Sequence, residues 1–154
     1  MLKYLAGSFY IPDNLETPIY WIAMFKLYAL TALFFFALDM LWLGVFAKGF
    51  YQHHLGHLLR PDVIWPAALI FYSIFIVGIL VFSVQPGLEA QSLMRSIALG
   101  SLLGLVTYAT FDLTCLALLK DFPVVVVYVD LVWGVVLTAS VSAAGYGFGR
   151  WLEL

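Results

Sequence analysis

Long apolar runs separated by short polar stretches make up most of the chain. The runs cover residues 27–47, 64–84, 96–119 and 124–144. Each is close to the roughly 20 residues that an α-helix needs to cross a hydrocarbon layer of about 30 Å. All are too long for the roughly ten-residue strands of a membrane barrel. The pattern therefore predicts an all-α integral membrane protein, built as an antiparallel four-helix transmembrane bundle.

The first 26 residues break this pattern. Two prolines and two acidic residues between positions 12 and 18 interrupt the apolar positions, so we expect no cleavable signal peptide. Two arrangements stay open for residues 1–26: a segment at the membrane interface, or an N-terminal extension of the first helix. We expect the membrane domain itself to cover residues 27–147, followed by a short tail over residues 148–154.

Composition supports a membrane location and limits the partners. Hydrophobic residues make up 64% of the chain and charged residues 10%, with a mean hydropathy of +1.03. A soluble domain carries about 25% charged residues. The net charge of −2, without a basic stripe, argues against nucleic acid as a partner. We expect contact with the lipid bilayer, and leave open a membrane-protein partner or a homo-oligomer.

Basic residues that flank the spans predict the orientation. Four of them fall on the side of the N-terminus and three on the opposite side. Membrane proteins keep an excess of Lys and Arg on the cytoplasmic side. We therefore expect an integral protein of the bacterial cytoplasmic membrane with a cytoplasmic N-terminus.

Three aspartates in three different spans fall at one depth. Asp39 lies eight residues before the end of the first span, and Asp112 eight residues before Lys120, which is about 12 Å of helix in each case. Asp130 lies seven residues after Pro123, or about 10 Å. The antiparallel arrangement therefore predicts one acidic layer in the half of the membrane opposite the N-terminus.

Aromatic residues accompany this layer. The segments "LDMLWLG" (38–44) and "VDLVWG" (129–134) each place an aspartate three residues before a tryptophan, so that the indole N–H can donate toward the layer. Tyr72 of the second span reaches the same depth. We therefore predict a buried acidic and aromatic pocket with these ligand-binding or ion-binding residues: Asp39, Asp112, Asp130, Trp42, Trp133 and Tyr72.

Small and polar residues indicate which helix faces point inward. In the last span, Asp130 begins a ridge that continues at four-residue steps through Gly134, Thr138 and Ser142. The third span carries a GxxxG pair that ends at Gly104. Such ridges let helix backbones approach closely inside membrane bundles.

Several functions fit such a layer. An aspartate at a helix centre disfavours membrane insertion by about 2.5–3.5 kcal/mol, so a proton or a cation should accompany the carboxyls. The favoured interpretation is a pocket for a proton, a cation or a polar head group, serving transport or lipid handling. Three alternatives stay open: aspartates that only hold helices together, an accessory subunit of a larger complex, and an enzyme that modifies lipids or isoprenoids with an acid–base pair of aspartates.

Metal and enzyme signatures are weak in this sequence. His53 and His57 stand four residues apart, a spacing that zinc-binding helices use, but the accompanying glutamate and a further ligand are missing. We predict no metal site, and the cofactor and any catalytic residues stay unassigned. No nucleophile elbow and no phosphate-binding loop occurs, which makes an enzyme the less favoured interpretation.

Several motifs in order give the chain a family resemblance. The segments "LDMLWLG", "FYQHHLGHLLRP", "GLVTYATFDLT" and "VDLVWG" resemble the small membrane proteins grouped as domain of unknown function 2177, over residues 26–146. The family commonly has Asn where this chain has Cys115. The resemblance implies a four-span membrane fold and no established activity. Matching positions are Asp39, Trp42, Gly44, Phe50, Tyr51, Gly56, Tyr72, Asp112, Thr114, Asp130, Trp133 and Gly134.

Overall fold

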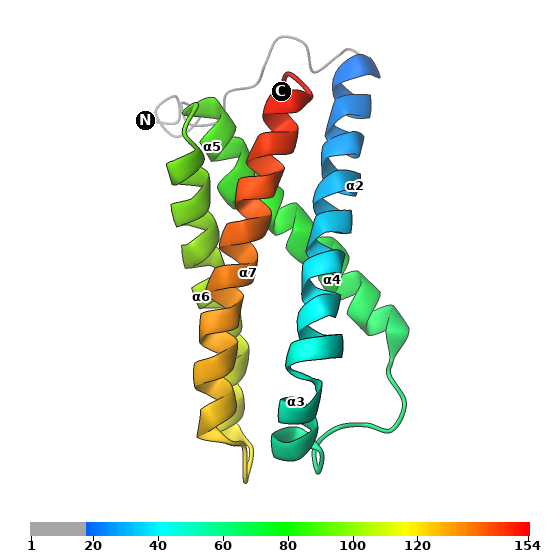
Figure 1. The fold of residues 1–154 in the computed structure, drawn as a ribbon, viewed down its shortest axis with the longest axis vertical. Helices are drawn as coiled ribbons and strands as arrows, with labels where there is room; N and C mark the ends of the chain where they lie inside the picture. Colours follow the sequence, from blue (N-terminus) through cyan, green and yellow to red (C-terminus); the bar gives the residue numbers. More distant parts are fainter. Residues whose placement is uncertain (1–17) are drawn as a thin grey trace, which may run out of the picture.

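The computed structural model describes residues 18–154, and within this range every regular element is a helix. Four long helical segments run in alternating directions along the molecule (Figure 1). By length and apolar composition, each of the four is able to cross a membrane. The prediction of an all-α four-helix membrane bundle is confirmed. The segments are Pro18–Phe46, Trp65–Glu89, Leu93–Leu118 and Val124–Trp151.

Two of the four segments contain a π-helical turn. The first segment joins α2 (Pro18–Leu41) to the π-helix η2 (Trp42–Phe46), and the short helix α3 (Lys48–Leu55) follows it. The second segment consists of α4 (Trp65–Ile79), the π-helix η3 (Leu80–Val84) and α5 (Gln85–Glu89). The third and fourth segments are the uninterrupted helices α6 (Leu93–Leu118) and α7 (Val124–Trp151).

Local sequence signals explain where helices α2 and α6 begin. Helix α2 begins at Pro18, a position where the missing backbone N–H of proline costs nothing. Residues 18–26 are therefore part of α2 and extend the first span toward the N-terminus, while residues 1–17 lie outside the described part of the chain. The hydroxyl of Ser92 caps α6 by accepting from the backbone N–H of Arg95 at 3.2 Å.

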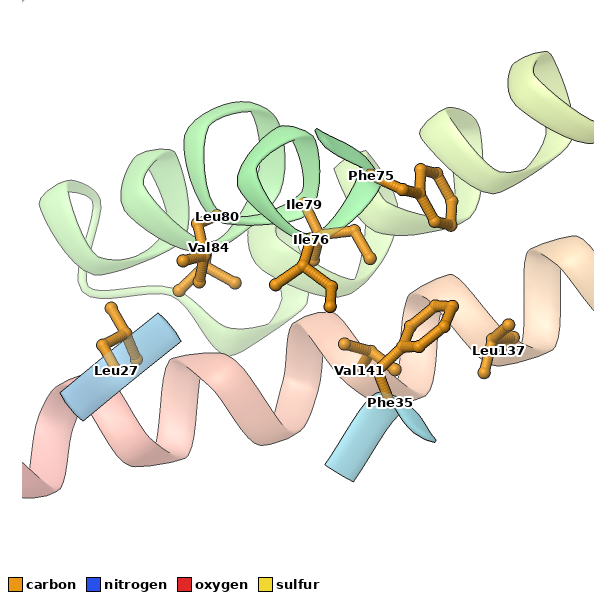
Figure 2. Close-up of a cluster of buried hydrophobic side chains, with 9 residues drawn as sticks. All are labelled: Leu27, Phe35, Phe75, Ile76, Ile79, Leu80, Val84, Leu137 and Val141. Atoms are coloured by element: carbon orange, nitrogen blue, oxygen red, sulfur yellow. The ribbon is translucent and has the colours of Figure 1, made fainter. Parts of the chain in front are cut away.

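An apolar core joins three of the four segments. Side chains from α2, from α4 with η3, and from α7 point toward one another (Figure 2). Burying such side chains is worth about 1.5–3 kcal/mol each in water, but in lipid the gain comes mainly from close packing. The buried residues are Leu27, Phe35, Phe75, Ile76, Ile79, Leu80, Val84, Leu137 and Val141.

Helices α6 and α7 pack through small residues. A Cβ atom added at Gly104 would collide with the backbone of Gly134, and one added at Gly100 would lie 2.9 Å from the carbonyl oxygen of Thr138. The predicted ridge of α7 is buried throughout, at Asp130, Gly134, Thr138 and Ser142. This close approach fixes the two helices that carry two of the three aspartates.

Candidate functional site

The three predicted aspartates, which we call the acid cluster, are all buried. Asp39 of α2 is 4% exposed, Asp112 of α6 is 0% exposed and Asp130 of α7 is 9% exposed. Each belongs to the inward face of its helix, because the buried residues of α2 and α6 recur at helical spacing before Asp39 and Asp112. The environments of the three carboxyls differ, and these differences define the chemistry of the site.

Asp39 is well supplied with hydrogen-bond donors. The hydroxyl of Tyr72 in α4 donates to its Oδ2 at 3.1 Å, and the indole N–H of Trp133 in α7 donates to its Oδ1 at 3.4 Å. Three segments of the bundle therefore meet at this carboxyl. Hydrogen bonds to a carboxylate are worth about 1.5–3 kcal/mol, so Asp39 has a clear role in holding the bundle together.

Asp130 takes part in a chain of side chains that begins at Trp42. The indole N–H of Trp42 donates to the hydroxyl oxygen of Tyr51 at 3.2 Å, and the Tyr51 hydroxyl donates to Oδ1 of Asp130. Tyr51 belongs to α3, outside the membrane-spanning segments. Burial, and then the hydrogen bond to Asp130, raise the pKa of the Tyr51 phenol above its ordinary value. Tyr51 therefore stays protonated and keeps its role as a donor.

Asp112 has neighbours but no donor. Both of its carboxyl oxygens are fully buried, and neither has a hydrogen-bond partner within residues 18–154. The carboxyl of Asp130 is near enough for its charge to act on Asp112 and for the two to share a hydrogen bond once one of them carries a proton. A buried polar group without a partner is rare and requires an explanation. Here the simplest one is a species outside the protein chain, such as a proton, a cation or water.

The two tryptophans of the repeated motif stack on each other. The ring centroids of Trp42 and Trp133 lie 4.3 Å apart, with 9° between the ring planes. Neither indole donates to the aspartate three residues before it: Trp133 donates to Asp39 of α2, and Trp42 donates to Tyr51. The repeated spacing therefore produces bonds between helices.

Two apolar grooves border this tryptophan pair. One has a volume of about 300 Å³ and is lined by Leu38, Leu41, Trp42, Phe46 and Trp133. The other has a volume of about 560 Å³ and is lined by Trp42, Tyr128, Val129, Val132, Trp133 and Val136. Both grooves open to the outside of the bundle, whereas the indole N–H groups point to the interior. The pair therefore lies between these grooves and the partners of its N–H groups, Tyr51 and Asp39.

Tyr51 is a residue of the site that the acidic and aromatic pattern of the spans does not predict. It lies in the connection between two spans, and only the family resemblance includes this position. Within α3, Phe50, Tyr51 and Leu55 pack against Phe122 and Val126 near the start of α7. The sequence signal for a helix that folds back on the bundle is the spacing of Phe50, Tyr51 and Leu55 within the connection between the first two spans.

The histidines of the same stretch do not form a helical pair. Helix α3 ends at Leu55, so His57 lies in the turn that follows, and Nδ1 of His54 lies 3.0 Å from the carbonyl oxygen of Phe50. Within residues 18–154, no group of three or more His, Cys, Asp or Glu side chains is placed to hold a metal ion. The three carboxyls of the acid cluster therefore do not converge on one metal site in this structure.

Fold and site together define a helical membrane protein with acidic residues buried inside its bundle. Residues 24–147 match the model of the predicted membrane protein family DUF2177. The chain belongs to this family, which confirms the resemblance drawn from its motifs. No curated protein and no solved structure matches the chain.

Proposed function

We propose that this membrane protein binds a proton or a small monovalent cation at the neighbouring carboxyls of Asp112 and Asp130. The observation that carries the proposal is Asp112, which is completely buried and has no donor for either carboxyl oxygen within the described residues. An ionised carboxylate in this position would be costly. A proton or a cation removes that cost, and the carboxyl of Asp130 supplies further oxygen ligands.

Access from one side of the membrane supports this proposal. Asp130 lies about 10 Å of helix from the start of α7, and its donor Tyr51 sits on α3 beside that end. Of the three aspartates, Asp130 is the residue with the largest exposed fraction, at 9%. An ion would therefore reach Asp130 first and Asp112 second. From the distribution of basic residues we infer that this side faces away from the cytoplasm, in a bacterial cytoplasmic membrane.

Infrared difference spectroscopy tests the proposal directly. The purified full chain in lipid vesicles is titrated from about pH 4, close to the pKa of an unperturbed aspartate, to about pH 8, above neutrality. We expect a C=O band of a buried protonated carboxyl that Asp112→Asn removes. The matched control is Asp62→Asn, since Asp62 is an exposed residue of the connection between α3 and α4.

Sodium or potassium added during the titration separates the two ligands. Loss of the band on addition of one cation identifies that cation as a competitor of the proton at the carboxyl pair. A spectrum without any protonated carboxyl, together with no cation-dependent change, would contradict the proposal. The aspartates would then act only in holding the helices together.

The apolar grooves favour a second candidate, a lipid with a cationic head group. Its hydrocarbon chain would lie in the groove of about 560 Å³, and its head would pass the indole faces, which attract cations, toward the acid cluster. Dodecylamine and lauric acid share a chain length and differ in charge. Quenching of tryptophan fluorescence by dodecylamine alone, lost in Asp130→Asn, would support this candidate, whereas equal quenching by both would exclude it.

A further inference from the structure

A second polar cluster extends from the middle of the bundle toward the end opposite the acid cluster, and we call it the hydroxyl site. It consists of five hydroxyl side chains from α2, η3, α6 and α7, all of them 0% exposed: Thr31, Ser83, Ser96, Thr138 and Ser142. Ser142 lies twelve residues after Asp130 in α7, about 18 Å along the helix axis. The serines of the hydroxyl site therefore lie in the half of the bundle away from the acid cluster, while Thr31 and Thr138 lie near the middle of their spans.

Ser142 is the centre of the hydroxyl site. Its Oγ lies 2.7 Å from Oγ of Ser83, and the Ser83 hydroxyl also lies 2.7 Å from the carbonyl oxygen of Ile79. Because Ser83 donates to that carbonyl, Ser142 donates to Ser83. The hydroxyl of Ser96 in turn donates to the carbonyl oxygen of Ser142 at 3.1 Å. The hydrogen bonds thus link three helical segments and run toward the start of α6.

Two hydroxyls of the site have no partner within the described residues: Thr31 Oγ1 and Thr138 Oγ1. Elsewhere in the chain, threonines such as Thr107 and Thr110 donate to a carbonyl one turn earlier in their own helix. Thr31 and Thr138 do not form this hydrogen bond within their own helix. Oxygen atoms that are fully buried and unpartnered in a polar site are the usual ligands of a buried water molecule.

The interval between the two clusters is filled by Tyr108. Its side chain packs directly on Gly134, which lies one turn after Asp130 and one turn before Thr138. Its phenol lies in the electrostatic range of Asp39 and Asp130. Along one face of α7, oxygen-bearing side chains therefore stand at Asp130, Thr138 and Ser142, and the ring of Tyr108 covers Gly134 between the first two.

We propose that the hydroxyl site holds water and that, together with the acid cluster, it forms a route for protons across the membrane. This inference rests on the proposed binding of a proton at Asp112 and Asp130. Along the route, each hydroxyl or water oxygen accepts a proton from the side of the acid cluster and releases its own proton to the next hydroxyl or water oxygen. Ser83 and Ser96, whose hydroxyls otherwise donate to backbone carbonyls, turn away from them to pass the proton on, and the proton leaves from Ser96 near the start of α6. One proton enters and one leaves, so no covalent product remains. The π-helix η3, which contains Ser83, fits such a role, because π-helical turns are frequent at functional sites.

Proton flux into vesicles tests this route. The full chain is reconstituted in vesicles that contain a pH-sensitive dye, and valinomycin with potassium balances the charge. We expect flux with the native chain and its loss in Asp112→Asn. Thr138→Val keeps the shape of the side chain and removes the hydroxyl. It should slow the flux up to about tenfold, since a hydrogen bond is worth about 0.5–1.5 kcal/mol and 1.36 kcal/mol corresponds to a factor of ten.

The matched control is Thr110→Val, because the exposed Thr110 hydroxyl bonds only within α6. It should conduct like the native chain. Thr138→Ser, which keeps a hydroxyl, should restore flux and so distinguishes loss of the route from loss of the fold. Native flux in both Thr138→Val and Thr31→Val would overturn the inference. The inference would also be overturned if the native chain conducts no protons while its carboxyl band still titrates. In that case the route is wrong, and the proposed binding of a proton at Asp112 and Asp130 stands.

Discussion

The indole of Trp133 in α7 donates to the carboxyl of Asp39 in α2, and its ring is stacked on Trp42, three residues beyond that same aspartate. Because α2 and α7 run in opposite directions (Figure 1), the two Asp-x-x-Trp motifs meet with reversed polarity. The motif of α2 supplies the acceptor, Asp39, and the motif of α7 supplies the donor, Trp133. This hydrogen bond and the stacking of the two indoles connect the first span to the last.

The stacked pair should show coupled energetics. In a double-mutant cycle, Trp42→Leu and Trp133→Leu should have an interaction free energy of about 0.5–1.5 kcal/mol, measured from unfolding in detergent. The control cycle pairs Trp133→Leu with Trp21→Leu, since the Trp21 side chain is 62% exposed. Additive effects in both cycles would argue against an energetic role for the stacking.

Tyr51→Phe should lower the free energy of unfolding by about 1–3 kcal/mol. The substitution removes the donor to Asp130 and leaves the Trp42 indole without its acceptor, and unsatisfied buried groups carry costs of this size. The matched control is Tyr128→Phe, where the side chain is 70% exposed. Equal melting temperatures for the two variants would show that α3 does not stabilise the site.

The raised pKa of Tyr51 predicts a dependence on alkaline pH. Because the folded chain holds the phenol proton above the ordinary value of about 10, Tyr51 stabilises the fold fully below that pH. This contribution is lost as pH rises from about 10 toward the folded-state pKa. The melting temperature should fall over this window less steeply in Tyr51→Phe than in the native chain. Parallel curves would contradict the assignment.

Asparagine should have opposite effects at two members of the acid cluster. At Asp39 it replaces one acceptor oxygen by an NH₂ group that faces the donor of Tyr72 or Trp133, so stability should fall by about 1–3 kcal/mol. At Asp112, which has no donor to lose, stability should stay unchanged or rise. The melting temperatures of Asp39→Asn and Asp112→Asn test this pattern. Equal losses of stability in the two variants would indicate that the acid cluster is purely structural.

Gly104→Ala should disrupt the packing of α6 on α7. The new Cβ would meet the backbone of Gly134, which cannot rotate away as a side chain can. Overpacking of this kind costs about 1–3 kcal/mol. Gly147→Ala is the matched control, because nothing lies within 4 Å of a Cβ at that position. A comparison of unfolding midpoints in detergent checks the prediction, and it fails if the two variants are equally stable.

Span number, fold class and the inward faces could be predicted from the sequence because apolar length and helical spacing encode them directly. The burial of Asp39, Asp112 and Asp130 followed from the same reasoning. The partners of the carboxyls could not be predicted in this way, since they depend on how helices distant in sequence are rotated against one another. Tyr51 became a donor only because α3 folds back onto the end of α7. The two π-helical turns likewise could not be predicted from the pattern of apolar positions.

The distribution of donors around Asp39 has a consequence for the biogenesis of the protein. If the spans leave the ribosome one by one, α2 enters the bilayer with a carboxyl that neither of its donors can yet reach. Tyr72 arrives with the second span and Trp133 only with the fourth. The first span therefore carries an insertion cost for this residue, at most about 2.5–3.5 kcal/mol, which Tyr72 relieves in part and Trp133 only when synthesis is nearly complete. Chains truncated before α7 should be retained poorly in the membrane and become substrates of its quality-control proteases.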